Sequence, residues 1–336
     1  MSQSPLRFGL IGTGRIGQVH AASIAADPDA ILTRIADPFV DGAHRVAALY
    51  GGTATDNSDE VFASGEVDAI LVASPTATHV DLISQAVDAG IPVLCEKPID
   101  LDIARVDALR PKVAAAGVPV ALGFNRRFDP AFASARARVA AGEIGALEQL
   151  TIISRDPSAP PAAYVGVSGG IFRDMTIHDF DMARFFLPEI VEVSAVGTRT
   201  FDPGAREHGD FDTAVTTLRA ASGATITIVN SRHSAVGYDQ RIEAFGGIGM
   251  LQVANAPSSL VSLSTATAVE AKPPYEEFFL ERYSVAYAAE LREFIKLARG
   301  EESTSPTFED GRAALVLADA AQRSATERVI VPVDLG

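Results

Sequence analysis

An aspartate and a histidine four residues apart are the first side chains whose types and spacing suggest proton transfer. Asp174 and His178 follow the pair Gly169-Gly170, after which the residue pattern becomes helical. A helix of about 3.6 residues per turn places such a pair on one face, so that a carboxylate and an imidazole point to one spot. A surface ion pair without function is the competing interpretation. A functional pair would handle protons and would need a substrate and partner groups from elsewhere in the chain.

A glycine-rich turn near the start of the chain predicts a dinucleotide site. The apolar run 6–11 leads into Gly12-Thr13-Gly14-Arg15-Ile16-Gly17, and a helical pattern follows. A strand, a G-x-G-x-x-G turn and a helix in this order are typical of dinucleotide-binding domains. Gly12 permits the tight turn, Gly14 the close approach of a pyrophosphate, and Gly17 the packing of helix on strand. The helix N-terminus adds N–H groups and a partial positive charge.

The end of the second strand indicates which dinucleotide binds. The apolar run 31–36 ends in Asp37, twenty residues beyond Gly17. An acidic side chain at this offset accepts hydrogen bonds from the adenosine ribose and repels a 2′-phosphate. Pro38 and Phe39 follow it, so no adjacent arginine is present to hold a phosphate. We therefore expect NAD rather than NADP; a solvated aspartate at a strand end is the alternative.

Strands and helices alternate in the first half of the chain. Apolar strands are expected over 69–73, 92–95 and 118–122, with helices over 43–50 and 79–89. Continuous apolar strands separated by amphipathic helices predict a parallel sheet covered on both faces, a doubly wound α/β fold of the Rossmann type. Ligands of such folds bind at the carboxyl ends of the strands.

Two polar segments occupy that edge of the predicted sheet. They are Ser74-Pro75-Thr76 with His79, and Glu96-Lys97-Pro98. Lys97 would emerge beside the cofactor crevice, although a solvated Lys–Glu couple is the competing interpretation. Together with the glycine turn and Asp37, these segments predict a cofactor site that comprises Gly12, Gly14, Arg15, Ile16, Gly17, Asp37, Ser74, Pro75, Thr76, His79, Glu96 and Lys97.

The pattern changes beyond residue 123. A mostly antiparallel sheet with few helices is expected, with strands over 147–153, 191–198, 213–219, 225–231, 240–245 and 250–253 and helices over 131–141, 275–299 and 308–324. A chain of 336 residues exceeds the usual size of one hydrophobic core. We therefore predict two domains, a Rossmann domain over 1–123 and an α+β domain over 124–336.

Composition excludes several classes of protein. The hydrophobic fraction of 47% and the charged fraction of 21% are those of an ordinary globular protein, and a net charge of −15 argues against a nucleic-acid surface. No apolar run approaches the roughly 20 residues that a membrane-spanning helix needs. The start of the chain lacks a signal-peptide pattern, so a cytoplasmic protein is expected. Cys95, the single cysteine, allows neither an intramolecular disulfide nor a multi-cysteine metal site, and no metal is expected.

Taken together, the motifs resemble the family of glucose-fructose oxidoreductases, inositol dehydrogenases and rhizopine-catabolism proteins. The glycine turn, the Ser74 and Glu96 segments, and the stretches 123–128 and 171–179 occur in the order typical of that family. The stretches 174–184, 237–241 and 278–283 are similar to its inositol-dehydrogenase branch. The resemblance covers essentially the whole chain.

The resemblance implies roles for residues at matching positions. It implies that Lys97, Asp174 and His178 form a catalytic triad. Substrate-binding residues are implied at Asn125, Arg126, Arg127, Asp179, Tyr238 and Tyr283. It also implies that the sheet of the second domain mediates a homodimer or homotetramer.

Chemistry supplies a role for each member of this triad. Oxidation of a secondary alcohol requires that one bound arrangement transfers a hydride to the nicotinamide and a proton to a base. An imidazole is a natural proton acceptor at neutral pH, so His178 is the expected general base. Asp174 would hydrogen-bond the substrate and stabilise the imidazolium, and the charge of Lys97 would favour the developing alkoxide. Alternatively, Lys97 itself takes the proton first.

The expected activity is NAD-dependent oxidation of a cyclic polyol, with myo-inositol giving 2-keto-myo-inositol. The polyol follows mainly from the resemblance. Oxidation of scyllo-inositol, or of a pyranose aldose at its anomeric carbon, is the nearest alternative, because only the stereochemistry of the pocket would differ. A regulator that senses NAD without turnover is a third possibility, but it predicts loss of the lysine or the histidine, and both are present.

Overall fold

The computed structural model describes residues 4–336, which divide into two compact units. The first unit runs up to Phe128 and includes Val285–Leu315, whereas the second comprises Asp129–Ser284 and Val316–Gly336. The expected division between residues 123 and 124 therefore differs from the compact units. A long segment near the C-terminus, expected in the second domain, packs with the first.

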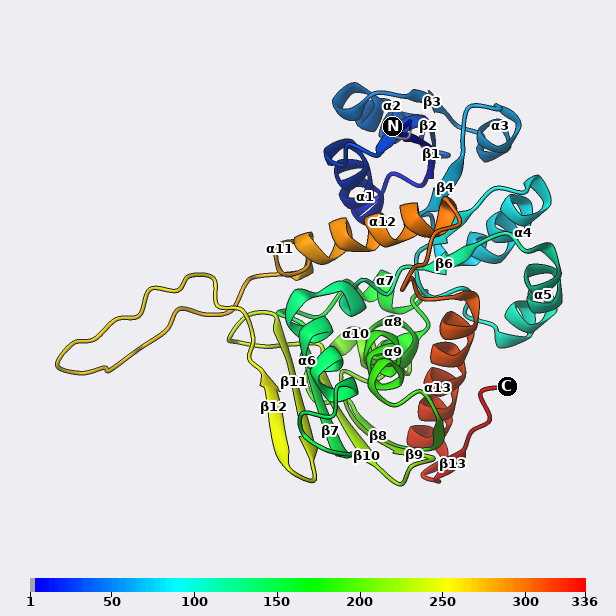
Figure 1. Ribbon diagram of the computed structural model, residues 1–336. Coiled ribbons are helices and arrows are strands. Elements are labelled where there is room, and N and C mark those ends of the chain that lie inside the picture. The colour runs from blue at the N-terminus through cyan, green and yellow to red at the C-terminus, as the bar shows by residue number, and fades with distance from the viewer. Residues whose placement is uncertain (1–3) are drawn as a thin grey trace. The chain divides into compact units, whose positions relative to one another are not determined.

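The first unit is built on a six-stranded parallel sheet of order β3-β2-β1-β4-β5-β6 (Figure 1). This confirms the expected doubly wound fold, because the order reverses between β1 and β4. Its strands are β1 Leu6–Ile11, β2 Ala30–Ala36, β3 Thr53–Thr55, β4 Ala69–Val72, β5 Val93–Cys95 and β6 Val120–Leu122. Its helices before residue 128 are α1 Arg15–Ala26, α2 Val40–Tyr50, α3 Ser58–Ala63, α4 His79–Ala89 and α5 Ile103–Ala116, with 3-10 turns at Thr76–Thr78 and Asn125–Phe128.

Helix α12, Ser284–Ala298, completes the core of the first unit. Leu291, Phe294 and Ile295 on one face of α12 are buried with Phe8 of β1, and the rings of Phe8 and Phe294 lie 6.1 Å apart. Spacings of three and four residues place these side chains on one stripe of the helix. The expected helix over 275–299 is wrong in its start, because the preceding segment contains only the short α11, Phe279–Arg282, and extended chain.

The second unit is built on a seven-stranded sheet of order β12-β11-β7-β10-β9-β8-β13 (Figure 1). Its strands are β7 Leu147–Arg155, β8 Ile190–Thr198, β9 Thr213–Ala220, β10 Thr225–Ser231, β11 Asp239–Gly246, β12 Gly249–Val253 and β13 Val331–Pro332. Only the β10–β7 pair is parallel. The mostly antiparallel α+β fold is therefore confirmed.

Helices cover one face of this sheet (Figure 1). They include α6 Pro130–Ala140, α7 Ala162–Val165, α8 Gly170–Asp174, α9 Ile177–Phe186, α10 Pro203–Glu207 and the second half of α13 Phe308–Glu327. Strand β10 alternates, with Ile226 and Ile228 fully buried and Thr225 exposed. Such alternation is the pattern of a sheet with one face packed on a core.

A long arm leaves the sheet after β12. The chain between β12 and α11 runs outward and returns as two extended segments (Figure 1). Isolated bridges between Leu263 and Ala271 and between Pro257 and Tyr275 join the two segments.

Candidate active site

The glycine turn of the first unit has the geometry that a pyrophosphate requires. A Cβ on Gly12 would lie 2.5 Å from the backbone of Ala73, and a Cβ on Gly17 would lie 2.1 Å from the oxygen of Gly12. Gly12 also has a φ of +98°, which favours glycine. At Gly14 nothing lies within 4 Å of a built Cβ, so that side of the turn is open. The turn is therefore tight where strand and helix meet and open where a phosphate would approach.

Asp37 lies directly after β2 and faces this turn. Its Oδ2 atom accepts hydrogen bonds from the backbone nitrogen of Thr13 at 2.8 Å and from the Thr13 hydroxyl at 2.7 Å. Its Oδ1 atom accepts from the backbone nitrogen of Phe39 at 2.9 Å. The structure thus brings Asp37 and the glycine turn together, as the dinucleotide interpretation requires. Within the turn, Arg15 is exposed and Ile16 is half-buried.

His79 links the two polar segments at the strand ends. It is 1% exposed, its Nε2 atom lies 2.9 Å from the carbonyl oxygen of Ser74, and its Nδ1 atom lies 2.7 Å from that of Pro98. The imidazole therefore spans from the Ser74-Pro75-Thr76 segment to the segment that contains Lys97. Both ring nitrogens contact the backbone of this chain, which indicates a positioning function for the ring.

A buried His–Glu pair underlies the same region, and sequence reasoning missed it. His20 of α1 is 1% exposed, and its Nε2 atom lies 2.8 Å from Oε1 of Glu96. The other oxygen of Glu96 accepts a hydrogen bond from the backbone nitrogen of Lys97 at 3.3 Å. The ring of Tyr287 packs edge-on against His20 at 5.5 Å. The one available signal was the position of His20 one helical turn beyond the glycine motif.

The predicted substrate residues of the first unit lie in its last 3-10 turn. Asn125 is 2% exposed and Arg126 is 4% exposed. An Nη2 atom of Arg127 lies 3.0 Å from a carboxylate oxygen of Asp310 in α13. Lys97, at the end of β5, is half-buried.

In the second unit, the expected continuous helix through Asp174 and His178 is wrong. Helix α8 ends at Asp174, and α9 begins at Ile177. The backbone nitrogen of His178 donates to the oxygen of Met175 at 3.3 Å, three residues back. At the break, the nitrogen of Thr176 donates to the oxygen of Ile171 five residues back, whereas α9 begins with bonds that reach three residues back. Both Asp174 and His178 are half-buried.

The glycine pair positions the start of α8. Gly169 and Gly170 have φ values of +83° and +85°. A Cβ on Gly170 would lie 2.7 Å from Oδ1 of Asp210, and the same oxygen accepts a hydrogen bond from the backbone nitrogen of Ile171 at 2.9 Å. The sequence places the glycine pair before a helical pattern, whereas only the tertiary structure shows that Asp210 accepts a hydrogen bond at the start of α8.

The remaining predicted substrate residues are buried. Asp179 is fully buried, and its Oδ2 atom accepts a hydrogen bond from the side chain of Asn230 at 2.7 Å. Tyr238 and Tyr283 are 5% and 1% exposed, and their rings meet edge-on at 5.9 Å. The hydroxyl of Tyr283 also donates to Gln240 at 3.3 Å. The structure therefore brings the two tyrosines together, although they lie far apart in the sequence.

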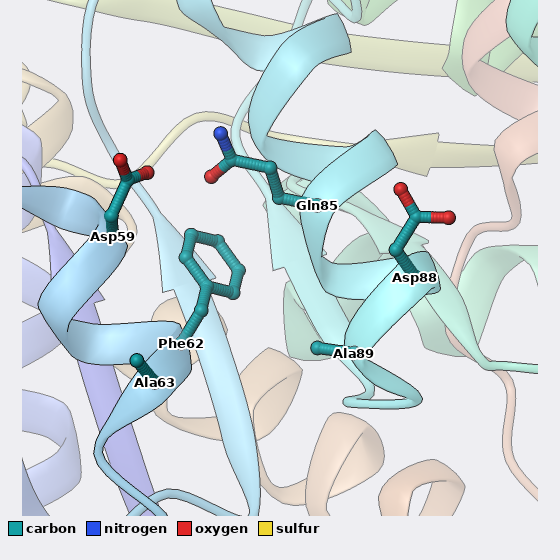
Figure 2. Close-up of a pocket in the computed structure, with 6 residues that line it drawn as sticks. All are labelled: Asp59, Phe62, Ala63, Gln85, Asp88 and Ala89. Carbon is teal, nitrogen blue, oxygen red and sulfur yellow. The ribbon is translucent and has the colours of Figure 1, made fainter.

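Two surface hollows of the first unit lie outside these motifs. Figure 2 shows one of them between α3 and α4, lined by Asp59, Phe62, Ala63, Gln85, Asp88 and Ala89. The other lies between α4 and α5 and includes Asp81, Arg105 and Lys112. Neither contains a residue of the predicted cofactor or substrate sites, so neither adds to the candidate site.

Comparison with known proteins decides the family. Residues 6–124 match the oxidoreductase family with an NAD-binding Rossmann fold, and residues 132–252 match the GFO/IDH/MocA C-terminal domain. Inositol 2-dehydrogenase of Rhizobium meliloti is 44% identical over 96% of this chain and 98% of its own. The chain belongs to the GFO/IDH/MocA family. The family predicted from the motifs is thereby confirmed.

Solved structures of GFO/IDH/MocA proteins share the fold along nearly the whole chain. A myo-inositol dehydrogenase from Corynebacterium glutamicum is 54% identical, with a TM-score of 0.95 over 98% of this chain and 99% of its own. A scyllo-inositol dehydrogenase from Lactobacillus casei, solved with NAD(H) and scyllo-inositol, is 28% identical, with a TM-score of 0.90 over 98% of this chain and 99% of its own.

The cofactor expectation agrees with the family. This GFO/IDH/MocA chain has an NAD-binding Rossmann domain, and the open side at Gly14 together with Asp37 beside Thr13 fits the pyrophosphate and the ribose of NAD.

Among the helices of residues 4–336, none is both long enough and apolar enough to cross a membrane. Within the same residues, no group of three or more His, Cys, Asp or Glu side chains is arranged to hold a metal ion.

Proposed function

We propose that this protein is an NAD-dependent dehydrogenase that oxidises one secondary alcohol of an inositol, with myo-inositol as the leading substrate. The observation that carries the proposal is full-length similarity to inositol dehydrogenases, at 44% identity to the Rhizobium meliloti enzyme and 54% to the Corynebacterium glutamicum structure. NAD supplies a hydride acceptor when it is bound. The residues of this chain must then bind the polyol, hold the reacting hydroxyl and remove its proton.

We assign that proton chemistry to Lys97, Asp174 and His178. Imidazole is the side chain best suited to accept a proton near neutral pH, so His178 is the proposed general base. Asp174 would orient the hydroxyl and stabilise the protonated imidazole, while Lys97 would stabilise developing negative charge on the substrate oxygen. Lys97 as the first proton acceptor is the alternative. Asn125, Arg126, Arg127, Asp179, Tyr238 and Tyr283 are the proposed substrate-binding residues.

The proposed cofactor-binding residues are those of the strand-end cluster described above. Direct contact is most strongly supported for the glycine turn and Asp37, because their geometry leaves the open face that a dinucleotide needs. His79 and Glu96 are buried and bonded to the chain itself, which supports an indirect contribution through the loops that they hold.

A panel assay tests the activity. The purified protein is incubated with NAD and with myo-inositol, scyllo-inositol or glucose, and formation of NADH is followed by its absorbance. Turnover highest with myo-inositol supports the proposal, and highest with scyllo-inositol would favour the second candidate, to which the similar Lactobacillus casei structure lends support. Activity confined to glucose would favour an aldose dehydrogenase. Absence of NADH formation from every inositol would refute the leading proposal, and NAD binding without any turnover would favour the regulator.

We also propose that the protein is a homo-oligomer, a tetramer or a dimer, that associates through the helix-free face of the second sheet. Val196, Val215, Val229 and Ile153 form a cross-strand row on four neighbouring strands of that face. Val196 is 64% exposed and Val215 is 43% exposed. A contiguous apolar row on a sheet surface is a typical protein-interaction site.

Light scattering of Val215→Glu and of the wild-type protein tests the oligomer. A charge placed in this row should lower the molar mass, whereas an unchanged mass would contradict the assignment.

We further propose a cytoplasmic location, which is compatible with a single, buried cysteine, Cys95, and the absence of any need for disulfides.

A further inference from the structure

Both oxygens of the Asp174 carboxylate are held by side chains from other elements of the second unit. Oδ1 accepts a hydrogen bond from the hydroxyl of Tyr164 at 2.8 Å. Oδ2 accepts one from Nη1 of Arg232 at 3.0 Å. Tyr164 lies in α7, and Arg232 directly follows β10. Neither residue was singled out by the sequence motifs.

Arg232 is a buried cation between two carboxylates. It is 1% exposed, and its Nη2 atom lies 3.6 Å from Oδ2 of Asp210. Burial of an unpaired guanidinium would be strongly unfavourable, so Asp174 and Asp210 stabilise Arg232 in this position. Burial acts to lower the pKa of Arg232, but the charges of Asp174 and Asp210 outweigh it and raise that pKa. Arg232 is therefore a permanent positive charge beside Asp174.

The same arginine connects the two ends of α8. Asp210 accepts the hydrogen bond from Ile171 near the start of the helix, and Asp174 is its last residue. Arg232 contacts both carboxylates, so the orientation of Asp174 depends on a residue that is separated from it by 58 positions. Arg232 thus fixes the end of a short helix that has few stabilising bonds of its own.

Tyr164 is a neutral donor on the other oxygen. Partial burial and then the adjacent Asp174 charge raise the pKa of the Tyr164 phenol well above its ordinary value; Arg232 opposes this effect and Asp156 adds to it. The hydroxyl therefore keeps its proton and continues to donate across the pH range of enzyme assays. The ring is 48% exposed, so its replacement by phenylalanine should leave the fold intact.

We propose that Arg232 and Tyr164 are positioning residues that hold the Asp174 carboxylate in one orientation, ready to accept a hydrogen bond from a hydroxyl of the substrate. Donors on two different oxygens restrict rotation of the carboxylate about its side-chain bonds. The conformational entropy of the Asp174 side chain is then lost during folding, so that its loss does not weaken substrate binding. The inference rests on the proposed function, because it assigns Asp174 to the substrate.

A double-mutant cycle on substrate binding tests the proposal. Myo-inositol is titrated calorimetrically into the complex with NADH, in which no turnover can occur, for wild type, Tyr164→Phe, Asp174→Ala and the double variant. We expect Tyr164→Phe to weaken inositol binding about tenfold in the wild-type background, the effect of a lost hydrogen bond to a charged group. In the Asp174→Ala background the same change should have no effect, because Tyr164 acts through Asp174.

Other outcomes of the cycle would overturn the proposal. An equal loss in both backgrounds would show that Tyr164 acts on the substrate without Asp174, and no loss in either would remove its role. Tyr50→Phe, a similar change at the end of α2, is the matched control and should leave affinity unchanged. Arg232→Lys keeps the charge but not the bond geometry. Arg232→Lys should lower kcat and inositol affinity in the wild-type background and leave affinity unchanged in the Asp174→Ala background. An equal loss of affinity in both backgrounds would contradict the positioning role of Arg232.

A measurement without substrate separates this inference from the proposed function. If wild type neither binds nor oxidises any inositol, the proposed function is wrong. Tyrosine labelled with ¹³C at Cζ then reports the contact directly by NMR, with the Tyr164 signal assigned from Tyr164→Phe. In wild type this signal should titrate at higher pH than in Asp174→Ala. Superimposable titrations would overturn the positioning role whatever the substrate is.

Discussion

Oδ2 of Asp37 accepts hydrogen bonds from both the backbone nitrogen and the hydroxyl of Thr13, at 2.8 and 2.7 Å. Burial acts to raise the pKa of Asp37, but the bonds from Thr13 and from the backbone of Phe39 outweigh it and hold that pKa below its ordinary value. Asp37 is therefore an anion at neutral pH, held at the edge of the glycine turn. An anion there repels the 2′-phosphate of NADP.

Replacement of Asp37 should erode the preference for NAD. We expect Asp37→Ala to raise the ratio of kcat/KM for NADP to that for NAD by about tenfold, because one unfavourable charge interaction of about 1.4 kcal/mol is removed. Initial rates with each dinucleotide measure the ratio. Asp41→Ala removes the same charge from an exposed position of α2 and is the control. An unchanged ratio in Asp37→Ala would count against the ribose assignment.

Lys97 should contribute to catalysis more than to cofactor binding. We expect Lys97→Met to lower kcat by about a hundredfold or more, because the cation that stabilises a developing alkoxide is lost while the aliphatic stem remains. The dissociation constant of NAD, measured by calorimetry, should stay within a few-fold of wild type. Lys112→Met, which removes a lysine that pairs with Asp88 on the surface of α5, is the control. Turnover equal to that of the control would refute the role of Lys97.

His79 should act through the two loops that it connects. His79→Ala removes contacts with the carbonyl oxygens of Ser74 and Pro98 at 2.9 and 2.7 Å. We expect a loss of about 1–3 kcal/mol in stability, because a neutral imidazole donates to one of these two carbonyl oxygens and that oxygen loses its donor. Affinity for NAD should fall as well, because the loops at the strand ends become less ordered. Thermal unfolding with and without NAD measures both effects, and wild-type behaviour in both would show that the ring does not hold the loops.

Asp212 should make the stability of the second unit depend on pH in the acidic range. Its carboxylate is fully buried and accepts backbone hydrogen bonds from Thr200, Phe201 and Asp202 at 2.9, 2.8 and 2.9 Å. Although burial acts to raise it, these bonds lower the pKa of Asp212 to about 2. A depressed pKa in the folded state contributes stability above the unfolded-state pKa of about 3.9. That contribution is lost progressively as the pH falls from about 4 to about 2.

Asp212→Asn tests this linkage. The variant should lose about 2 kcal/mol at neutral pH, because an amide NH₂ group faces backbone donors. The difference from wild type should shrink as the pH falls through the range in which Asp212 titrates. Unfolding temperatures at a series of pH values measure this, with the exposed Asp56→Asn as control. A difference that does not change with pH would show that the charge of Asp212 is not what stabilises the fold.

Local sequence patterns were sufficient to predict that the glycine turn and Asp37 lie together at the ends of neighbouring strands. The glycine turn, the strand before it and the aspartate twenty residues later lie within one short segment, and short-range spacing defines them. Most strands of both sheets could likewise be predicted from apolar runs and alternation. The helix through Asp174 and His178 was predicted as continuous, because side-chain periodicity does not report that the spacing of the backbone hydrogen bonds changes around Met175 and Thr176.

The amino-acid sequence by itself determined the family, the two sheets and the chemical types of the candidate site, since each depends on residues that are neighbours along the chain. Only the tertiary structure decided that α12 completes the first core, that His20 pairs with Glu96, and that Arg232 and Tyr164 hold Asp174. The contacts of His20 with Glu96 and of Arg232 with Asp174 join residues 76 and 58 positions apart. Contacts of this kind leave no periodic signature, because they arise when separate elements pack and their buried charges require partners.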